Sequence, residues 1–447
     1  MSNRTALAIL MGMITVPAYG AGFALIEQSA SGFGNAYAGM AARADDASIQ
    51  FFNPASLSWL PAGRQIVLGG SAILPSAKLR NANASYLGNG ASVSGNNGGD
   101  VGSLELVPNF YLATDLGQDL KFGLGVTVPY GLTSEYDDGW KGRYQGLKSE
   151  VMTINVNPAL SFKASDKLSI GGGVSLQYVK AELTSALDSS AICLQNVNQG
   201  TCNALGLGQA GNAAVDSYSK LKGDDLSWGF NLGVIYRPWE GTSLGASYRS
   251  HIKHKLEGEA SFRRSGAIDQ IAPLAARLSG SDITANLSMP ENVSLSVVQS
   301  LTERLELLAD VTWTKWSRFK ELRVKFDSGV EDNVTTTKWD DSYRVSLGGN
   351  YRYNDQLTLR AGVAYDQTPV PSSSHRTPRI PDADRTWFAV GASWKLDPFN
   401  TIEVGYAYLR MKDSGMNHSS EGAVRHNVQG EFSSRVDILS AQWNRSF

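Results

Sequence analysis

Few side chains in this sequence have the type and spacing that catalysis or metal binding requires. Two of its five histidines, His251 and His254, lie three residues apart in a segment that reads as a β-strand. Side chains at that spacing point to opposite faces of a strand, so the two rings are badly placed to share a substrate. We therefore predict that the protein is not an enzyme and uses no cofactor and no metal.

The first twenty residues have the pattern of an export signal. A polar start with Arg4 precedes an apolar run over residues 6–16, and the small residues Ala18 and Gly20 suit a signal peptidase. The apolar run is far shorter than the ~20 residues that a membrane-spanning helix needs. We predict a signal peptide at residues 1–20.

Export decides how the two cysteines, Cys193 and Cys202, are interpreted. They stand close together in one polar segment. An oxidising compartment favours a disulfide, whereas a metal site would need further cysteine or histidine ligands nearby. We expect a disulfide that staples a surface loop.

The composition suits a protein that crosses a membrane with β-strands better than one that crosses it with helices. The sequence is 42% hydrophobic and 18% charged, with 46 glycines and a net charge of −2. Its mean hydropathy is only −0.20, as expected of strands with one face on lipid and the other on a polar lumen. The near-neutral charge argues against a nucleic-acid partner, which would require a basic surface.

From about Arg64 onward, apolar and polar residues alternate with the period of β-strands, most clearly from Leu305 to Trp313. Six short turns alternate with seven longer loops, which divides the chain into fourteen strands. The longer loops are expected at residues 81–103, 131–146, 186–223, 263–281, 327–336, 367–384 and 413–432. This is the layout of an antiparallel outer-membrane β-barrel, here over residues 63–447.

Residues 21–62 do not alternate. They are rich in alanine, glycine and serine, yet they include apolar side chains such as Phe23, Phe33 and Leu57. A solvated tail would not carry so many apolar side chains. Since the lumen of such a barrel is wide enough to be plugged, we predict that this segment is an N-terminal hatch.

A series of short motifs supports this reading. They are Ala21 to Gly39, Asp45-Asp46-Ala47, Asn53-Pro54-Ala55, Pro129-Tyr130-Gly131-Leu132, Met289-Pro290-Glu291, Trp313-Thr314-Lys315-Trp316, Asp341-Ser342-Tyr343-Arg344, Pro369-Val370-Pro371 and Arg379 to Trp387. In this order they resemble the FadL family of outer-membrane long-chain fatty acid transporters. The resemblance spans the chain from the mature N-terminus to its end.

The resemblance implies passive uptake of long-chain fatty acids or other hydrophobic small molecules by a monomeric barrel in outer-membrane lipid and lipopolysaccharide. The ligand would settle in an external groove, move to an inner apolar pocket and leave sideways where the third strand kinks. An alkyl chain gains about 0.8 kcal/mol per buried CH₂, so apolar sites can pass it on without an energy source.

Three motifs acquire roles from the resemblance. Pro129, Tyr130 and Gly131 would form the lateral gate, because glycine permits a sharp bend and proline removes a ladder donor; an ordinary strand end is the alternative. Phe23 would contact or gate the inner pocket, or simply pack within the plug. Asn53-Pro54-Ala55 would form a fixed turn that holds the hatch to the wall.

The external groove would involve the loops at 131–146 and 186–223. Apolar residues gathered in long loops mark a binding surface, although they suit a small core between loops equally well. The candidates are Trp140, Tyr144, Leu187, Ile192, Leu194, Leu205 and Leu207.

The carboxylate-binding residues of the family's fatty acid carriers are not transferred. Alignment through the flanking motifs puts Ser185 and Thr335 where those carriers have basic side chains. Substitutes would be Lys180, Lys338 or Arg344. Inward-facing arginines such as Arg344, Arg352 and Arg360 also form salt-bridge networks, here with Asp310 or Glu403.

Two alternatives therefore remain open. A channel for monoaromatic hydrocarbons needs no cationic partner for its ligand. A general diffusion porin would have an open lumen instead of the predicted plug.

Overall fold

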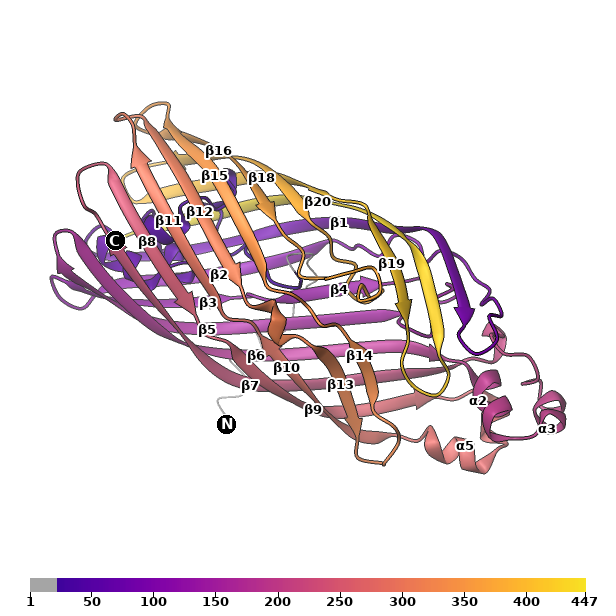
Figure 1. Cartoon of the computed structure of the whole chain (residues 1–447). Coiled ribbons are helices and arrows are strands. Elements are labelled where there is room, and N and C mark those ends of the chain that lie inside the picture. Colours follow the sequence, from indigo (N-terminus) through magenta and orange to yellow (C-terminus); the bar gives the residue numbers. More distant parts are fainter. Residues whose placement is uncertain (1–21) are drawn as a thin grey trace.

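The computed structural model describes residues 22–447, so the predicted signal peptide lies outside the described residues. These residues form one antiparallel sheet that closes on itself as a barrel (Figure 1). The first strand, β1 (Arg64–Tyr86), pairs with the last, β20 (His426–Ser446), and this pairing closes the wall. Twenty strand segments make up fourteen wall strands, because six wall strands are interrupted. The predicted fourteen-stranded barrel with an N-terminal plug is confirmed.

The segments between β1 and β20 follow one another around the wall. They are β2 (Glu105–Asp115), β3 (Leu120–Thr127), β4 (Gly131–Glu135), β5 (Lys148–Ser165), β6 (Leu168–Leu187), β7 (Ser217–Tyr236), β8 (Thr242–Arg249), β9 (Ile252–Arg263), β10 (Ser281–Met289), β11 (Asn292–Ser300), β12 (Leu305–Thr314), β13 (Glu321–Phe326), β14 (Asn333–Thr336), β15 (Ser342–Arg352), β16 (Leu357–Asp366), β17 (Arg385–Lys395), β18 (Asn400–Met411) and β19 (Ser414–Ser419). The interrupted wall strands are β3 with β4, β8 with β9, β10 with β11, β12 with β13, β14 with β15 and β18 with β19.

The wall turns its apolar side chains outward and its polar ones inward, the reverse of a water-soluble protein. On β6, Ile170, Val174 and Leu176 expose between 46% and 50% of their surface on the outer face. Ser175 and Gln177 of the same strand face the lumen and are buried. This arrangement fits a lipid environment, where outward polar groups would find no hydrogen-bond partners.

Strands at the long-loop end extend further than the sequence pattern indicates. Residues 81–103 and 413–432 were expected as loops, but β1 continues to Tyr86 and β20 begins at His426, and these two residues pair. The polar composition at this level is compatible with strands, because the paired backbones continue their hydrogen bonds beyond the apolar band. The expectation of a loop from Gly131 is corrected in the same way, since Gly131 to Glu135 form β4.

The segment from Gly22 to Gly63 lies inside the barrel and is almost completely buried. It consists of irregular chain and four short 3₁₀ helices, η1 (Phe33–Asn35), η2 (Met40–Ala42), η3 (Ala47–Phe51) and η4 (Pro54–Trp59). Their contacts reach strands on every side of the lumen. A methyl group on Gly34 of η1 would lie 2.6 Å from Cα of Gly391 in β17, so only glycine permits this close approach to the wall.

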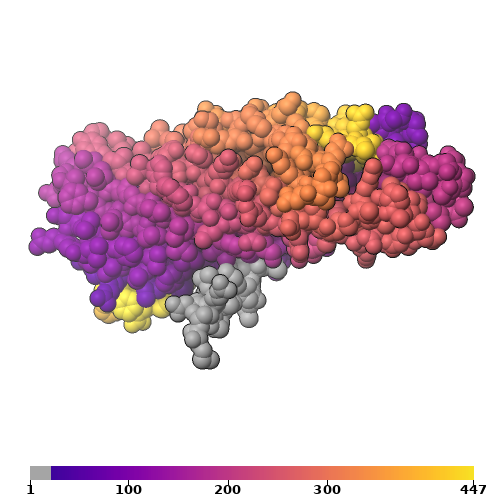
Figure 2. Space-filling model, turned by 90° about the horizontal axis from the view of Figure 1, so that it is seen from below, coloured from indigo at the N-terminus to yellow at the C-terminus, as the bar shows by residue number. Residues whose placement is uncertain are grey.

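Short helices form a cap at the long-loop end of the barrel. They are α2 (Ser189–Asn196), α3 (Gln199–Ala204), α4 (Gly266–Asp269) and α5 (Ala272–Arg277), with the 3₁₀ helix η5 (Ala213–Val215) beside them and η6 (Trp316–Arg318) elsewhere in the barrel. Figure 2 shows the cap as the magenta and red surface at one end of the elongated molecule. Among residues 22–447, no helix combines the length and the apolar character needed to cross a membrane.

We expect Val174→Arg, in the middle of the outward apolar stretch of β6, to destabilise the barrel by about 2–4 kcal/mol, the cost of an arginine near the bilayer midplane. Reversible urea unfolding in lipid vesicles would measure it. Lys180→Arg on the same strand, beyond the apolar stretch, should leave the unfolding midpoint unchanged. Equal midpoints for both variants would contradict the proposed lipid-facing surface.

Candidate functional site

The turn Asn53-Pro54-Ala55 joins the hatch to the wall. The side-chain oxygen of Asn53 accepts a hydrogen bond from the N–H of Ala55 at 3.0 Å, and its amide nitrogen donates to the carbonyl of Val234 in β7 at 3.1 Å. The carbonyl of Ala55 accepts hydrogen bonds from the hydroxyls of Ser161 and Ser169 at 3.0 and 2.9 Å. The turn is therefore bonded to three neighbouring wall strands, β5, β6 and β7.

The backbone ladder of the wall stops beside the hatch, at the break between β3 and β4. Pairing of β2 with β3 ends at Phe110 and Val126, while β4 pairs with β5. Within the described residues, β2 from Glu105 to Asn109 therefore has a ladder partner on the β1 side alone. The break itself spans Val128 to Tyr130, and Gly131 is the first residue of β4.

A hatch glutamine replaces the missing ladder at the start of this break. Gln28 donates from Nε2 to the carbonyl of Val128 at 2.7 Å and accepts at Oε1 from the N–H of the same residue at 3.0 Å. On the other side, the hydroxyl of Thr153 accepts from the N–H of Tyr130 at 3.0 Å and donates to its carbonyl at 2.6 Å. Two side chains thus bond to backbone groups of a strand that has left the regular sheet.

Backbone groups of the hatch supply further hydrogen bonds to the bent strand. The N–H of Leu25 donates to the carbonyl of Pro129 at 2.8 Å, and the N–H of Gly131 donates to the carbonyl of Phe23 at 2.9 Å. These bonds form an isolated antiparallel bridge centred on Ala24 and Tyr130. Since an unpaired buried backbone group costs roughly 1–3 kcal/mol, the first hatch residues stabilise the bent strand directly.

Phe23 lies at the centre of an aromatic cluster. Its ring centroid is 4.8 Å from that of Trp316, 5.8 Å from Phe319 and 6.0 Å from Tyr130 and Trp339. These four rings belong to the wall and its connections, and Phe23 also lines a cavity, while its role as a gate stays a prediction.

Members of this cluster line two cavities inside the barrel. The apolar chamber, on the long-loop side of Phe23, has a volume of about 80 Å³. Its surface is almost entirely apolar and is formed by residues such as Phe23, Leu132, Leu221, Leu256, Leu287 and Phe319, although the polar residues Ser149, Lys222, Thr335, Thr337, Thr377 and Arg379 also border it. The hatch cavity, of about 130 Å³, lies between the hatch and the wall and is more polar. Its lining includes Leu25, Glu27, Tyr130, Arg249, Asp310 and Arg344.

The predicted cations do not lie in the apolar chamber. Lys338 is exposed and Lys180 faces outward, and neither lines one of the two cavities. Arg344 lines the hatch cavity, where Nη2 donates to the carbonyl of Ala36 at 2.9 Å and the guanidinium lies 5.1 Å from the Trp387 ring.

The lumenal network is partly as predicted. Arg360 forms the expected buried salt bridge with Glu403. Arg344 and Asp310 form no salt bridge, and Arg352 is exposed without an acidic partner in the described part of the chain.

A cation that the sequence did not single out, Arg379, borders the apolar chamber. Its Nη1 donates to the hydroxyl of Ser149 at 2.9 Å and to the carbonyl of Lys148 at 3.2 Å. Burial lowers the pKa of Arg379 to about 10, so the guanidinium stays protonated at neutral pH. Arg379 belongs to the motif Arg379 to Trp387, but only the tertiary structure shows that it borders a cavity.

The external loops bury some of the residues predicted for the groove. Trp140 is fully buried, stacks on Tyr136 with centroids 4.1 Å apart and donates from Nε1 to the carbonyl of Gly146 at 2.8 Å. Tyr144 lines a small polar cavity, and its hydroxyl donates to Asp216 at 2.9 Å. Trp140 thus belongs to a core between loops.

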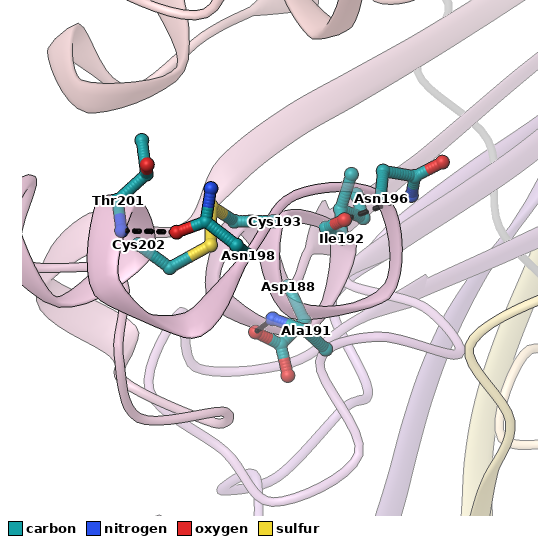
Figure 3. The surroundings of a disulfide bond; sticks show 8 residues. All are labelled: Asp188, Ala191, Ile192, Cys193, Asn196, Asn198, Thr201 and Cys202. Atoms are coloured by element: carbon teal, nitrogen blue, oxygen red, sulfur yellow. Dashed lines mark hydrogen bonds between the residues drawn. A yellow bond between two sulfur atoms is a disulfide. The ribbon is translucent and has the colours of Figure 1, made fainter.

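The disulfide and its neighbours form a second core. Cys193 and Cys202 are joined by an S–S bond of 2.08 Å. Ile192 and Leu194 pack around it, together with Leu205 and the buried Leu207, whereas Leu187 is half-buried at the end of β6. Figure 3 shows how Asp188 and Asn198 cap the two helices beside the bond.

A lumen filled by a wall-bonded hatch, a ladder interrupted beside it and internal apolar space define the class of plugged outer-membrane transport barrels. Comparison with known proteins places the chain within this class. The sequence profile described as "Outer membrane protein transport protein (OMPP1/FadL/TodX)" matches residues 11–447, and the chain belongs to this family. It is therefore an outer-membrane transporter of hydrophobic compounds.

Relatives support this assignment over nearly the whole chain. Outer membrane protein P1 of Haemophilus influenzae is 31% identical, with 92% of this chain and 90% of the relative aligned. The long-chain fatty acid transport protein of Escherichia coli is 28% identical over 100% and 98% of the two chains. The crystal structure of a Pseudomonas aeruginosa FadL homologue matches with a TM-score of 0.84 and 28% identity, covering 96% and 100%.

A more distant structure shows the fold alone. The Pseudomonas putida toluene transporter TodX matches with a TM-score of 0.66 and 21% identity, covering 97% and 99% of the two chains.

We expect Asn53→Ala to loosen the hatch, because it leaves carbonyl and amide groups of the hatch and wall unpaired at roughly 1–3 kcal/mol per group. Trypsin should cleave the hatch faster, and planar-bilayer recordings should show added current fluctuations. The exposed loop variant Asn97→Ala is the control. Unchanged proteolysis and current would show that this turn does not hold the plug.

Proposed function

We propose that the protein takes up long-chain fatty acids and related hydrophobic compounds passively, along an external surface, the apolar chamber and a lateral opening at the break in the third wall strand. The observation that supports this best is the position of the break. The wall ladder is missing beside β4, and Leu132 of β4 also lines the apolar chamber. The hatch closes the direct route along the barrel axis.

The energetics of the cargo favour such a route. Each CH₂ that moves from water into apolar surroundings contributes about 0.8 kcal/mol, in the chamber and again in the bilayer. A long alkyl chain therefore needs no coupled energy source, provided that no step places it in water. A sideways exit meets this condition, because the ligand passes from apolar chamber to lipid.

The fatty acid is the first choice of ligand because of the relatives that align over full length. The Escherichia coli relative is named a long-chain fatty acid transport protein. Monoaromatic hydrocarbons are the second candidate, since the chamber is almost wholly apolar and TodX, a toluene transporter, has the same fold. The protein would act as a monomer surrounded by outer-membrane lipid and lipopolysaccharide.

Uptake by a transporter-deletion strain that expresses this chain distinguishes these ligands. We expect labelled oleate to accumulate faster than in the empty-vector strain, with a smaller effect on labelled toluene. The reverse ratio would favour the hydrocarbon channel. Large steady ion currents through reconstituted protein, with no uptake of either compound, would indicate a diffusion porin.

We expect Gly131→Val to reduce oleate uptake severalfold, because a β-branched residue favours a regular strand where β4 begins beside the bent segment. Binding of oleate to the external surface of whole cells should persist. Gly139→Val is the matched control, since open space surrounds Gly139 in the neighbouring loop. Wild-type uptake by a correctly folded Gly131→Val variant would exclude the lateral route.

A further inference from the structure

Two cations, Lys222 and Arg379, border the apolar chamber, and within the described residues Arg379 is the one without an acidic partner. This side chain borders two spaces at once, the apolar chamber and a polar cavity of about 60 Å³ on the loop side. The polar cavity is lined by Tyr144, Gln145, Ser185, Asn333, His418 and Glu421 among others. Thr335 and Thr377 also border both spaces. Arg379 therefore lies at the boundary between the polar cavity and the apolar chamber.

Arg379 has no acidic partner in the described part of the chain. Its two hydrogen bonds, to Ser149 and to the carbonyl of Lys148, both come from Nη1. Glu421 lines the polar cavity, but it accepts a hydrogen bond from the N–H of Thr336 at 2.9 Å and forms no salt bridge with Arg379. A guanidinium has five N–H donors, so Nε and Nη2 keep donors for another acceptor.

The neighbouring cations, in contrast, have acidic partners. Arg385 forms a salt bridge with Asp382 at 2.7 Å, and Lys222, the other cation of the chamber lining, lies 3.6 Å from Glu182. A buried cation without a counter-ion is costly unless hydrogen bonds or a ligand compensate it. Gly146 permits the position of Arg379, because a methyl group there would lie 3.2 Å from its Cγ and 3.3 Å from its Cζ.

We propose that Arg379 binds the carboxylate of an amphiphile whose alkyl chain occupies the apolar chamber. The head group would lie at the boundary of the two spaces, within reach of Nε and Nη2, and the tail would point toward Phe23. Arginine suits this task, because its planar fork matches both oxygens of a carboxylate. The assignment rests on the proposed function and makes the ligand an ionised fatty acid instead of a neutral hydrocarbon.

The test compares two ligands with the same alkyl chain, labelled oleate and oleyl alcohol. Binding is measured to the full-length protein in lipid nanodiscs at mildly alkaline pH, with empty nanodiscs as background. The unsubstituted protein should prefer oleate. Arg379→Gln should weaken oleate binding by about 10- to 100-fold, the range of a hydrogen bond to a charged group, and leave oleyl alcohol within about twofold.

Two further variants make the result specific. Arg379→Lys keeps the charge but not the fork, so it should restore part of the oleate affinity. Lys325→Gln removes an exposed cation of β13 that lines neither cavity and should change the binding of neither ligand. Heat-modifiable migration on gels checks that each variant is folded.

The outcomes distinguish a failure of the Arg379 assignment from a failure of the proposed function. If Arg379→Gln and Arg379→Lys both leave oleate binding unchanged, or weaken both ligands equally, the carboxylate role of Arg379 is wrong and uptake of hydrophobic compounds stands. If the unsubstituted protein binds neither alkyl ligand, the proposed function fails and this assignment fails with it.

Discussion

The structure depends on one constraint, that hydrocarbon supplies no hydrogen-bond partner to a peptide group. Closure of β1 against β20 meets this constraint around the wall. At the break after β3 the ladder cannot meet it, and the hatch does so instead through Gln28 and the backbone of Phe23 and Leu25. The hatch and the break in the wall strand are therefore joined in one hydrogen-bonded unit. The start of the hatch cannot move away without exposing backbone groups of the bent strand.

The same constraint explains how charge is distributed in the lumen. Buried ions cost free energy unless they are paired, and most of them here have partners, such as Arg360 with Glu403 and Arg143 with Asp216. Such pairs hold the hatch side and the loop side of the interior in fixed positions. Between them lies an almost purely apolar chamber. A ligand that replaces empty space there gains contacts without breaking an ion pair, which suits passive transport.

The sequence predicted the wall better than the contacts inside it. Alternation over segments such as Leu305 to Trp313 is a local property, and it predicted fourteen strands because lipid selects one face of each strand. Strand ends outside the bilayer were missed at Tyr86 and His426, since no lipid-facing pattern marks them. The bond between Gln28 and Val128 joins residues 100 positions apart, and the cavity position of Arg379 depends on several strands together. Neither leaves a periodic signal in the sequence.

Transport also limits how tightly the interior can bind its ligand. A site must bind well enough to fill and weakly enough to empty. In the chamber, the ligand gains free energy because its apolar surface is buried. The gain is nearly the same in the bilayer, so it does not oppose release into lipid. A contact with the head group has no equivalent in hydrocarbon and would set the barrier to release. In the proposed role, a single guanidinium at the boundary of the chamber, already bonded to Ser149 and Lys148, would keep that barrier low and would still separate ionised from neutral ligands.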